Sequence, residues 1–270
     1  FMENHGVSVS YIPVDRDGMV DPSDVAGAVR PETIMISIMH ANNEVGTIQP
    51  IAEIARLAGE NGIVFHTDAA QSVGKIPVRV DEMRVGLLSV AGHKVYAPKG
   101  VGALYIRKGL HADRLFHGAG QERGVRAGTE NVLEIAGLGK ACEIAGRDLG
   151  RNETHMRAMR DRLEKGIEDG LDDARFNGHP ENRLPNTSSI SFLGIEADRL
   201  LEEIGLDVAA SAGAACHSDR VEISHVLKAM GVPTDWAKGT VRFSTGRMTT
   251  SDEIDRAVDV VVSAVKRLRG

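Results

Sequence analysis

The chain has 270 residues, of which 42% are hydrophobic and 26% charged, and its formal net charge is −6. This length is sufficient for one large domain or two ordinary ones with a sizeable core. The acidic balance argues against nucleic-acid binding and against binding to anionic membranes, since both need a clustered basic surface. No apolar run approaches the span of a bilayer and no secretion signal opens the chain, so we expect a cytoplasmic location.

Strand signals and helix signals alternate along the first half of the chain. A helix is expected to begin at Asp21, an N-cap residue type that is followed by proline, and another at Pro50. The second helix carries Ile51, Ile54, Ala55 and Ala58 on one face. Such alternation is typical of a mostly parallel sheet covered by helices. β-Branched or apolar runs predict strands at residues 7–14, 33–39, 63–66, 86–90 and 101–106.

The pattern changes after about Gly128, where apolar and small residues recur at helical spacing. Polar helix-forming residues then run through 151–168, which predicts a long connecting helix or a pair of helices. The residues expected on the apolar face of the first of these helices are Val132, Ile135, Gly139, Cys142 and Ala145.

A second block of strands and helices follows, so we place a domain boundary at residues 148/149. Strands are expected at 187–192, 206–209 and 240–244, and a helix at 197–204. A closing helix carries a capping-box pattern, Thr250 with Glu253. We predict an α/β protein with an incomplete large domain over 1–148 and a small α/β domain over 149–270.

Two side chains in the first block follow strands of the expected sheet. Asp68 comes directly after the strand at 63–66, and Lys94 comes shortly after the strand at 86–90. The carboxyl ends of such strands form the ligand crevice of open α/β sheets. A lysine amine and an aspartate are what pyridoxal phosphate needs from a protein, one to bind its aldehyde and one to keep its pyridine nitrogen protonated. Taken alone, Asp68 could equally cap a short helix over 69–73.

Six stretches together resemble the cysteine desulfurases of iron–sulfur cluster assembly, within the class V aminotransferase-like proteins of fold-type I. The resemblance runs nearly end to end and preserves the order of the motifs. It implies a homodimeric enzyme that uses pyridoxal 5'-phosphate and L-cysteine and passes sulfur to an acceptor or scaffold protein. The stretches are "HANNEVGTIQPI", "FHTDAAQSVGK", "AGHKVYAPKGVGALYIRKG", "GAGQERGVRAGTENV", "SAGAACHS" and "VRFSTGR".

The resemblance also implies roles for particular residues. Lys94 matches the lysine that binds the cofactor covalently, and Asp68 the residue that faces the pyridine nitrogen. Gln71 matches the donor to the phenolic oxygen of the cofactor. The remaining matches are His93 for a phosphate contact, Thr129 for a contact to the phosphate of the partner subunit, Asn43 near the substrate carboxylate and Arg242 as the arginine that clamps this carboxylate.

The chain has two cysteines, which the sequence places in different settings. Cys216 lies among Gly, Ala and Ser with no helical or strand period, which predicts a mobile loop. Cys142 falls on the expected apolar helix face, which predicts packing. In the family resembled, the cysteine that matches Cys216 attacks the sulfur of the substrate cysteine and leaves alanine and an enzyme persulfide. Mobility would let this sulfur reach both the cofactor and an outside acceptor.

The sequence departs from the family pattern in two places. Ala91 stands where the family usually has a hydroxyl residue before Gly-His-Lys, which removes one expected phosphate contact. The family's N-terminal stretch, with a Gly-Ala-Thr-Glu type phosphate loop and a histidine that stacks on the pyridine ring, is expected to be missing. The chain starts at Phe1, which suggests a truncated enzyme with weakened cofactor affinity.

Other readings remain open from the sequence. A selenocysteine lyase or a class V aminotransferase would share Lys94 and Asp68. A truncated, inactive remnant that only dimerises or docks to a scaffold is a non-enzymatic alternative. A dinucleotide-binding module is disfavoured because no Gly-x-Gly-x-x-Gly follows a strand. No metal site is expected, and His40 and His66 are expected to pack or to satisfy backbone groups.

Overall fold

A computed structural model describes residues 3–212, 214–217 and 220–270. The chain divides into two compact units, which are treated one at a time. Unit 2 comprises Glu32–His40 and Ile51–Leu149, and unit 1 comprises Phe1–Pro31, Ala41–Pro50 and Gly150–Gly270. The division after Leu149 lies one residue from the boundary expected at 148/149. It differs from that expectation because two N-terminal segments group with the C-terminal half.

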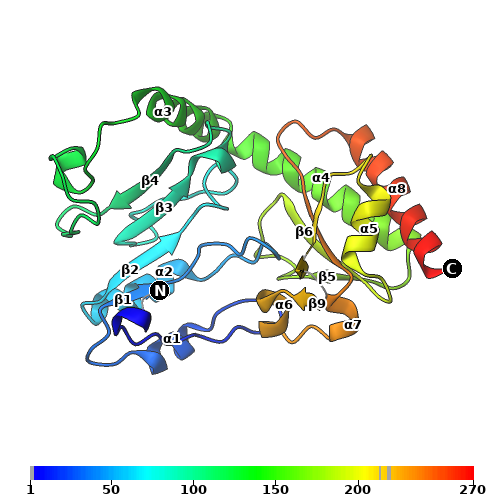
Figure 1. The fold of residues 1–270 in the computed structure, drawn as a ribbon, viewed down its shortest axis with the longest axis horizontal. Helices are drawn as coiled ribbons and strands as arrows, with labels where there is room; N and C mark the ends of the chain where they lie inside the picture. Colours follow the sequence, from blue (N-terminus) through cyan, green and yellow to red (C-terminus); the bar gives the residue numbers. More distant parts are fainter. Residues whose placement is uncertain (1–2, 213, 218–219) are drawn as a thin grey trace. The chain divides into compact units, whose positions relative to one another are not determined.

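Unit 2 is built on a four-stranded sheet in the order β1-β2-β3-β4 (Figure 1). The first three strands are parallel, and β4 runs antiparallel to β3. The mostly parallel sheet expected from the sequence is therefore confirmed. Its strands are β1 (Met35–Ser37), β2 (Val64–Asp68), β3 (Leu87–Ala91) and β4 (Gly102–Ile106).

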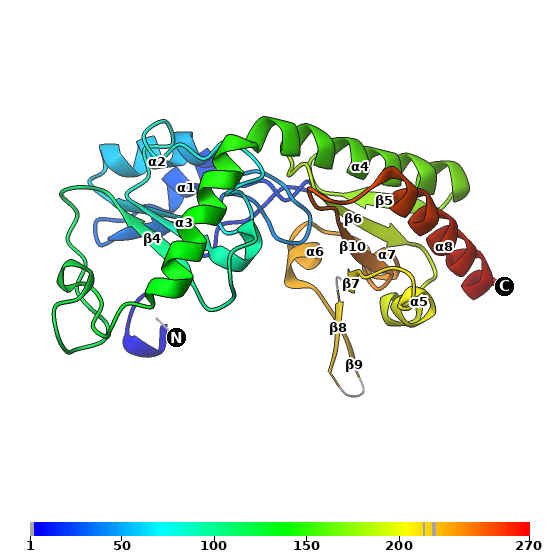
Figure 2. The same cartoon turned by 90° about the horizontal axis from the view of Figure 1, so that it is seen from above.

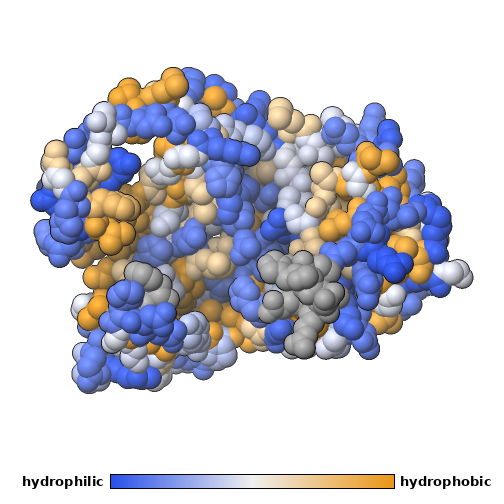
Figure 3. Space-filling model, viewed as in Figure 1, coloured by the Kyte–Doolittle hydropathy of each residue, from blue (hydrophilic) through white to orange (hydrophobic). Residues whose placement is uncertain are grey.

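Helix α2 (Ile51–Glu60) covers one face of this sheet and contacts β2. Its four buried residues are the ones predicted from the apolar spacing, Ile51, Ile54, Ala55 and Ala58. The opposite face of the sheet carries exposed apolar side chains, including Met35 and Leu104, and this apolar surface is visible over the strands in Figure 3. The remaining helical elements of unit 2 are η2 (Gly92–Val95), η3 (Glu122–Gly124) and α3 (Val132–Arg147).

Helix α3 forms as expected, but most of the residues predicted on its buried face are exposed. Val132 is 71% exposed and Ile135 44% exposed, and Cys142 is also exposed, so the expectation that Cys142 packs in a core is wrong. The buried residues are Leu138, Ala141 and Ala145, of which only Ala145 was predicted. The cause lies beside the helix, since a Cβ at Gly137 would meet the ring of Pro98 at 2.9 Å. Small residues let this side of α3 approach the segment after η2 closely.

Unit 1 contains a second four-stranded sheet in the order β5-β6-β10-β7, in which every pair of neighbours is antiparallel. A separate two-stranded hairpin, β8-β9, projects from this unit in Figure 2. The strands are β5 (Ala174–Asn177), β6 (Thr187–Phe192), β7 (Ser211–Ala212), β8 (Ala214–His217), β9 (Arg220–Ile223) and β10 (Thr240–Ser244). The helices are η1 (Glu3–His5), α1 (Pro22–Ala28), α4 (Leu149–Gly170), α5 (Ala197–Ile204), α6 (His225–Ala229), α7 (Thr234–Ala237) and α8 (Ser251–Arg269).

Helices α4, α5 and α8 pack with the sheet of unit 1 to form its core. Fully buried Ile167, Leu200 and Val261 belong to one cluster with Ile190 and Val241 of the strands. Helices α4 and α8 lie so close together that a Cβ at Gly166 would meet the side chain of Val258 at 2.7 Å. Helix α8 begins with the expected capping box, in which the Thr250 hydroxyl accepts from the Glu253 amide and the Glu253 carboxylate accepts from the Thr250 amide.

Two strands expected from the sequence do not form. Residues 7–14 are not a strand, and Tyr11 within them is 80% exposed. Residues 206–209 instead follow the end of α5 in a turn, where the amides of Asp207 and Val208 both donate to the Ile204 carbonyl and Leu206 is fully exposed. Both stretches have strand-like composition, but neither pairs with another strand among the described residues. Helix α1 begins as expected, with Asp21 as N-cap and Pro22 in the first turn.

Candidate functional site

Asp68 and Lys94, two of the predicted cofactor residues of unit 2, lie at one edge of its sheet. Asp68 is the last residue of β2, and Lys94 lies in η2, which follows the end of β3 directly. Strands β2 and β3 are parallel, with Asp68 paired to Ser89, so both side chains come from the same carboxyl edge. This arrangement brings a carboxylate and an amine to the position at which open α/β sheets bind ligands.

Asp68 is held by its own following turn. Its Oδ1 accepts a hydrogen bond from the Ala70 amide at 2.8 Å, and its backbone carbonyl accepts from the His40 amide at 2.8 Å. Residues 69–73 form turns and not a helix, so Asp68 does not cap a helix there. The hydrogen bond from the Ala70 amide is what remains of the capping alternative. None of the described contacts uses the second carboxylate oxygen, which leaves it available for a ligand.

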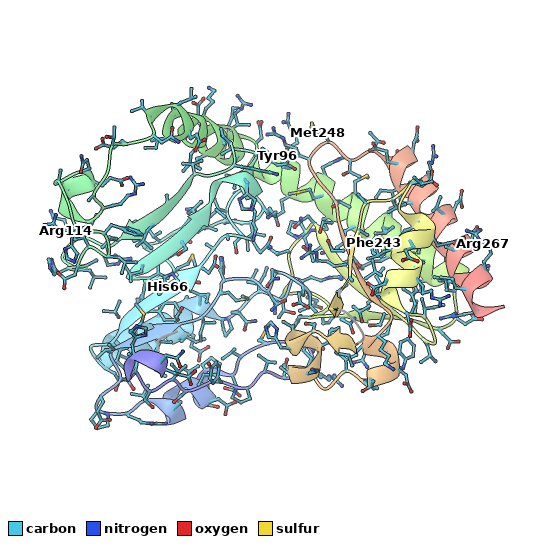
Figure 4. All side chains as sticks on the ribbon, viewed as in Figure 1. His66, Tyr96, Arg114, Phe243, Met248 and Arg267 are labelled. Carbon is cyan, nitrogen blue, oxygen red and sulfur yellow. The ribbon has the colours of Figure 1, made fainter. Side chains whose placement is uncertain are left out.

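Lys94 is positioned by tight backbone packing around η2. A Cβ at Gly92 would lie 2.6 Å from the Val101 carbonyl oxygen, so only glycine lets η2 approach the start of β4 this closely. Tyr96 ends the turn in the left-handed region with φ of 67°, a strained conformation for a tyrosine (Figure 4). The Lys94 side chain is half-buried, and no described residue forms an ion pair or hydrogen bond with its ammonium.

A second amine, which the sequence analysis missed, lies in the turn that carries Gln71. The Lys75 Nζ donates to the Gln71 carbonyl at 2.8 Å. Burial, with a smaller contribution from the nearby charge of Lys94, lowers the pKa of Lys75 to about 8. Lys75 follows Gln71 at helical spacing, which is the only sequence signal that could have indicated this contact.

The two residues predicted to contact the cofactor phosphate are exposed in unit 2. His93 lies beside Lys94 in η2, and Thr129 precedes α3 in the loop that ends at the N-cap Asn131. No described contact places Thr129 at the edge that carries Lys94, and its assignment to the phosphate of a partner subunit stays a prediction.

The two histidines of unit 2 for which packing or backbone contacts were expected lie in different surroundings. His66 lies on β2 with its ring between two hydroxyls, Ser37 Oγ at 2.8 Å and Ser89 Oγ at 2.9 Å (Figure 4). Burial lowers the pKa of His66, and the charge of Asp68 opposes this shift. His40 is buried, its Nδ1 has no partner among the described residues, and burial lowers its pKa to about 4.

The predicted substrate residues form a second group, which lies in unit 1. Arg242 of β10 donates from Nη1 to the Asn43 carbonyl at 2.8 Å and from Nη2 to Ser211 Oγ at 3.2 Å. Its Nε is buried without a hydrogen-bond partner among the described residues. A buried guanidinium donor with no partner is unfavourable unless a ligand accepts its hydrogen bond. A carboxylate is the acceptor that matches this planar fork of donors.

Cys216 lies in β8, where it is paired with Val221 of β9. The expectation that it lies on a loop without regular structure is therefore wrong for its backbone. The alternation of apolar and polar residues that usually reveals a strand is absent from "SAGAACHS", because most of its residues are small. Its side chain is outside the described part of the structure.

The described residues show neither a metal site nor a membrane span. They contain no group of three or more His, Cys, Asp or Glu side chains that could hold a metal ion. None of the described helices combines the length and the apolar character needed to cross a bilayer.

Comparison with known proteins identifies relatives over the whole chain. The family model described as aminotransferase class-V matches residues 1–257. "Cysteine desulfurase IscS" of Dictyoglomus turgidum is 47% identical over 270 residues, which are 100% of this chain and 68% of that protein. The protein of the same name from Methanosarcina thermophila is 48% identical over 270 residues and is covered to 67%. The chain thus spans about two thirds of the length of these relatives.

Solved structures agree with these sequence matches. A structure titled "NIFS-LIKE PROTEIN" superposes with a TM-score of 0.90 at 36% identity and covers 98% of this chain and 70% of that one. A NifS-like protein from Rickettsia africae superposes with a TM-score of 0.89 at 28% identity, over 98% of this chain and 71% of that one. The fold-type I architecture expected from the sequence is confirmed by these similarities.

Proposed function

The chain belongs to the class V aminotransferase family and, within it, to the cysteine desulfurases, and from this premise we propose which of its residues perform the reaction. The observation that carries the proposal is the shared sheet edge of Asp68 and Lys94, which two parallel strands bring together. Both groups suit pyridoxal 5'-phosphate, the cofactor of this family. The Lys94 amine has no competing partner among the described residues, and one oxygen of Asp68 is available.

We propose that the residues of this edge divide the work of holding the cofactor. Lys94 binds its aldehyde, Asp68 holds a proton on its ring nitrogen, and the Gln71 side chain donates to its phenolic oxygen. His93, and Thr129 of the partner subunit, contact its phosphate. When bound, pyridoxal phosphate supplies an electron sink that weakens bonds next to the substrate α-carbon.

The substrate carboxylate is assigned to Arg242, with Asn43 beside it. Support comes from the buried Nε of Arg242, which lacks a partner among the described residues. Arg242 is also oriented before substrate arrives, because the Asn43 carbonyl and Ser211 Oγ hold the other two nitrogens of its guanidinium. A preoriented bidentate donor fixes the substrate without the cost of ordering a long side chain.

Cys216 is the proposed sulfur acceptor. Its thiolate attacks the sulfur of the substrate L-cysteine, a sulfur–sulfur bond forms, and the carbon–sulfur bond of the substrate breaks. The bonding electrons of the broken bond stay with the carbon, which takes up a proton and becomes the methyl group of L-alanine. The enzyme keeps the sulfur as a persulfide, so atoms and electrons balance without an external oxidant.

The wider context of the reaction is also part of the proposal. We place the enzyme in the cytoplasm, because a reducing compartment keeps Cys216 as a thiol. Exposed apolar residues at the start of α3 and in the loop before it support a homodimer, since such residues are typical of interfaces. They are Leu115, Phe116, Val132 and Leu133. The persulfide passes to an acceptor or scaffold protein of iron–sulfur cluster assembly.

The experiment that tests this function measures alanine and persulfide formation from L-cysteine by the chain supplied with pyridoxal phosphate. Cys216→Ala is expected to abolish both products while cofactor binding stays unchanged. Cys142→Ala is the matched control, because Cys142 is an exposed thiol on α3, and it is expected to leave both rates unchanged. Persulfide on Cys142, or alanine formation by the Cys216 variant, would contradict the assignment.

A further inference from the structure

The loop that contains Asn43 is a hydrogen-bonded turn of unit 1. The Asn42 Oδ1 accepts from the amides of Glu44 at 2.8 Å and Val45 at 3.0 Å. The Gly46 amide donates to the Asn42 carbonyl, with Gly46 at a φ of 79° that favours glycine. These bonds close a tight turn, so Asn43 and Glu44 are presented in fixed positions.

Glu44 holds the C-terminal end of the segment that carries Cys216. Ser224, the N-cap of α6, donates from Oγ to Glu44 Oε2 at 2.5 Å and accepts from the Val226 amide at 3.0 Å. One hydroxyl thus joins the loop to α6, directly after strand β9. The joint is also packed, because Val45 belongs to a buried cluster with Leu227 of α6.

Arg242 holds the N-terminal end of the same segment. Ser211 accepts from Arg242 Nη2, and its strand β7 pairs with β10 in a register that places Ser211 opposite Arg242. Arg242 in turn donates to the carbonyl of Asn43. Both ends of residues 211–224 are therefore tied, through one hydroxyl each, to the adjacent residues Asn43 and Glu44.

We infer that Glu44, Ser224 and Ser211 are positioning residues for sulfur transfer, which fix both ends of the Cys216 hairpin on the substrate carboxylate site. The inference rests on the proposed roles of Arg242 and Cys216. A thiol that must reach the substrate sulfur reacts faster from a fixed starting position, because even a small misplacement of the reacting atoms lowers the rate. Substrate and hairpin then share one support, the loop at Asn43 and Glu44.

The test compares Glu44→Ala, Ser224→Ala and the double variant with the parent chain. The bond between the two side chains involves a carboxylate, so each single variant is expected to lower kcat for alanine formation about tenfold. KM for L-cysteine is expected to stay unchanged, because Arg242 keeps its contacts. The double variant is expected to lose no more than Ser224→Ala, since that variant already lacks both the bond to Glu44 and the N-cap bond. Glu44→Gln, which retains an acceptor oxygen, should recover part of the rate.

A second readout is independent of catalysis. Hydrogen exchange of the backbone amides of β8 and β9, measured on the cofactor-free chain, is expected to accelerate about tenfold in Glu44→Ala and Ser224→Ala. Thr250→Ala is the matched control, because Thr250 is also an N-cap hydroxyl bonded to a glutamate, on α8. It is expected to change neither the hairpin exchange nor kcat.

The outcomes separate this inference from the proposed function. Unchanged exchange in β8 and β9 overturns the inference, even if the parent chain makes no alanine. Faster exchange with unchanged kcat also overturns it, because the hairpin would then not position the thiol. A parent chain that binds pyridoxal phosphate but makes no alanine contradicts the proposed function and leaves the exchange result to decide on the anchoring contacts.

Discussion

The two groups of proposed site residues are positioned in different ways. In unit 2, Asp68 and Lys94 are placed by backbone topology, namely the ends of two parallel strands and the close approach of Gly92 to β4. In unit 1, Arg242 is placed by side-chain hydrogen bonds that join distant segments. The first kind of site depends on strand order and a glycine, and the second on particular polar side chains. Substitutions should therefore damage the two units through different physical causes.

The largest expected effect comes from Gly92→Ala in unit 2. The new Cβ would lie 2.6 Å from the Val101 carbonyl oxygen, and backbone atoms there cannot move without parting β3 from β4. We expect the free energy of unfolding to fall by about 4 kcal/mol, because losses of this size arise from specific causes such as a clash in a packed site. Unfolding in denaturant measures this change in the free energy of unfolding. Gly59→Ala in α2 is the matched control, because a Cβ there meets nothing within 4 Å, and it should be neutral or stabilising.

The counterpart in unit 1 removes a buried charge partner. Glu164 accepts from both terminal nitrogens of Arg183 at 2.7 Å, and the two side chains are only 14% and 12% exposed. Glu164→Ala leaves the guanidinium without its partner, so we expect a loss of about 3 kcal/mol in the free energy of unfolding.

The matched control for Glu164 is Asp169 on the same helix. Asp169 pairs with Lys165, but both side chains are more than half exposed, so Asp169→Ala should cause no measurable loss. If Glu164→Ala and Asp169→Ala lost the same free energy of unfolding, burial would not distinguish the two ion pairs. That result would contradict the claim that buried polar side chains stabilise unit 1.

His40 gives unit 2 a pH dependence that a single substitution can isolate. Because burial lowers its pKa from 6.5 to about 4, the unfolded chain binds the proton more readily than the folded one. Stability is therefore lost as pH falls from 6.5 to about 4, by up to about 3 kcal/mol. In His40→Leu this part of the acid dependence should be absent from unfolding curves. A pH dependence identical to that of the parent would rule out this cause.

The last prediction concerns Lys75. Its pKa of about 8 means that the folded chain carries a neutral amine there at a pH at which exposed lysines are charged. The burial penalty on its ammonium is complete below pH 8 and disappears as pH rises to 10.5, so the stability contributed by this group rises over that window. Competitive acetylation with peptide mass analysis should give a titration midpoint near 8 for Lys75. A midpoint equal to that of exposed Lys99 would contradict this.

The sequence was sufficient to predict what depends on local pattern. The parallel strands, the buried face of α2 and the capping box of α8 follow from periodicity and end signals, and the pair Asp68 and Lys94 follows from strand ends. The failures arise where a distant neighbour decides. Pro98 against Gly137 selects which side of α3 turns inward, and residues 7–14 pair with no strand in the part of the chain that the structure describes.

The anchoring contacts of the Cys216 hairpin could not be predicted for a related reason. Glu44 and Ser224 are far apart in the sequence, and each has an ordinary local role, in a turn and at an N-cap. Only the fold brings their side chains together. Lys75 was missed because its burial, which lowers its pKa, is set by the packing of the whole turn.

The most direct test of the central claim is to incubate the chain with pyridoxal phosphate, reduce it with borohydride and map the modified lysine by mass spectrometry. The account predicts one adduct, on Lys94, with Lys75 and the exposed Lys99 unmodified. Lys94→Ala should then lose the adduct, whereas Lys99→Ala should retain it. Adducts spread over exposed lysines, or one that persists in the Lys94 variant, would contradict the claim that the strand ends of unit 2 present this amine to the cofactor.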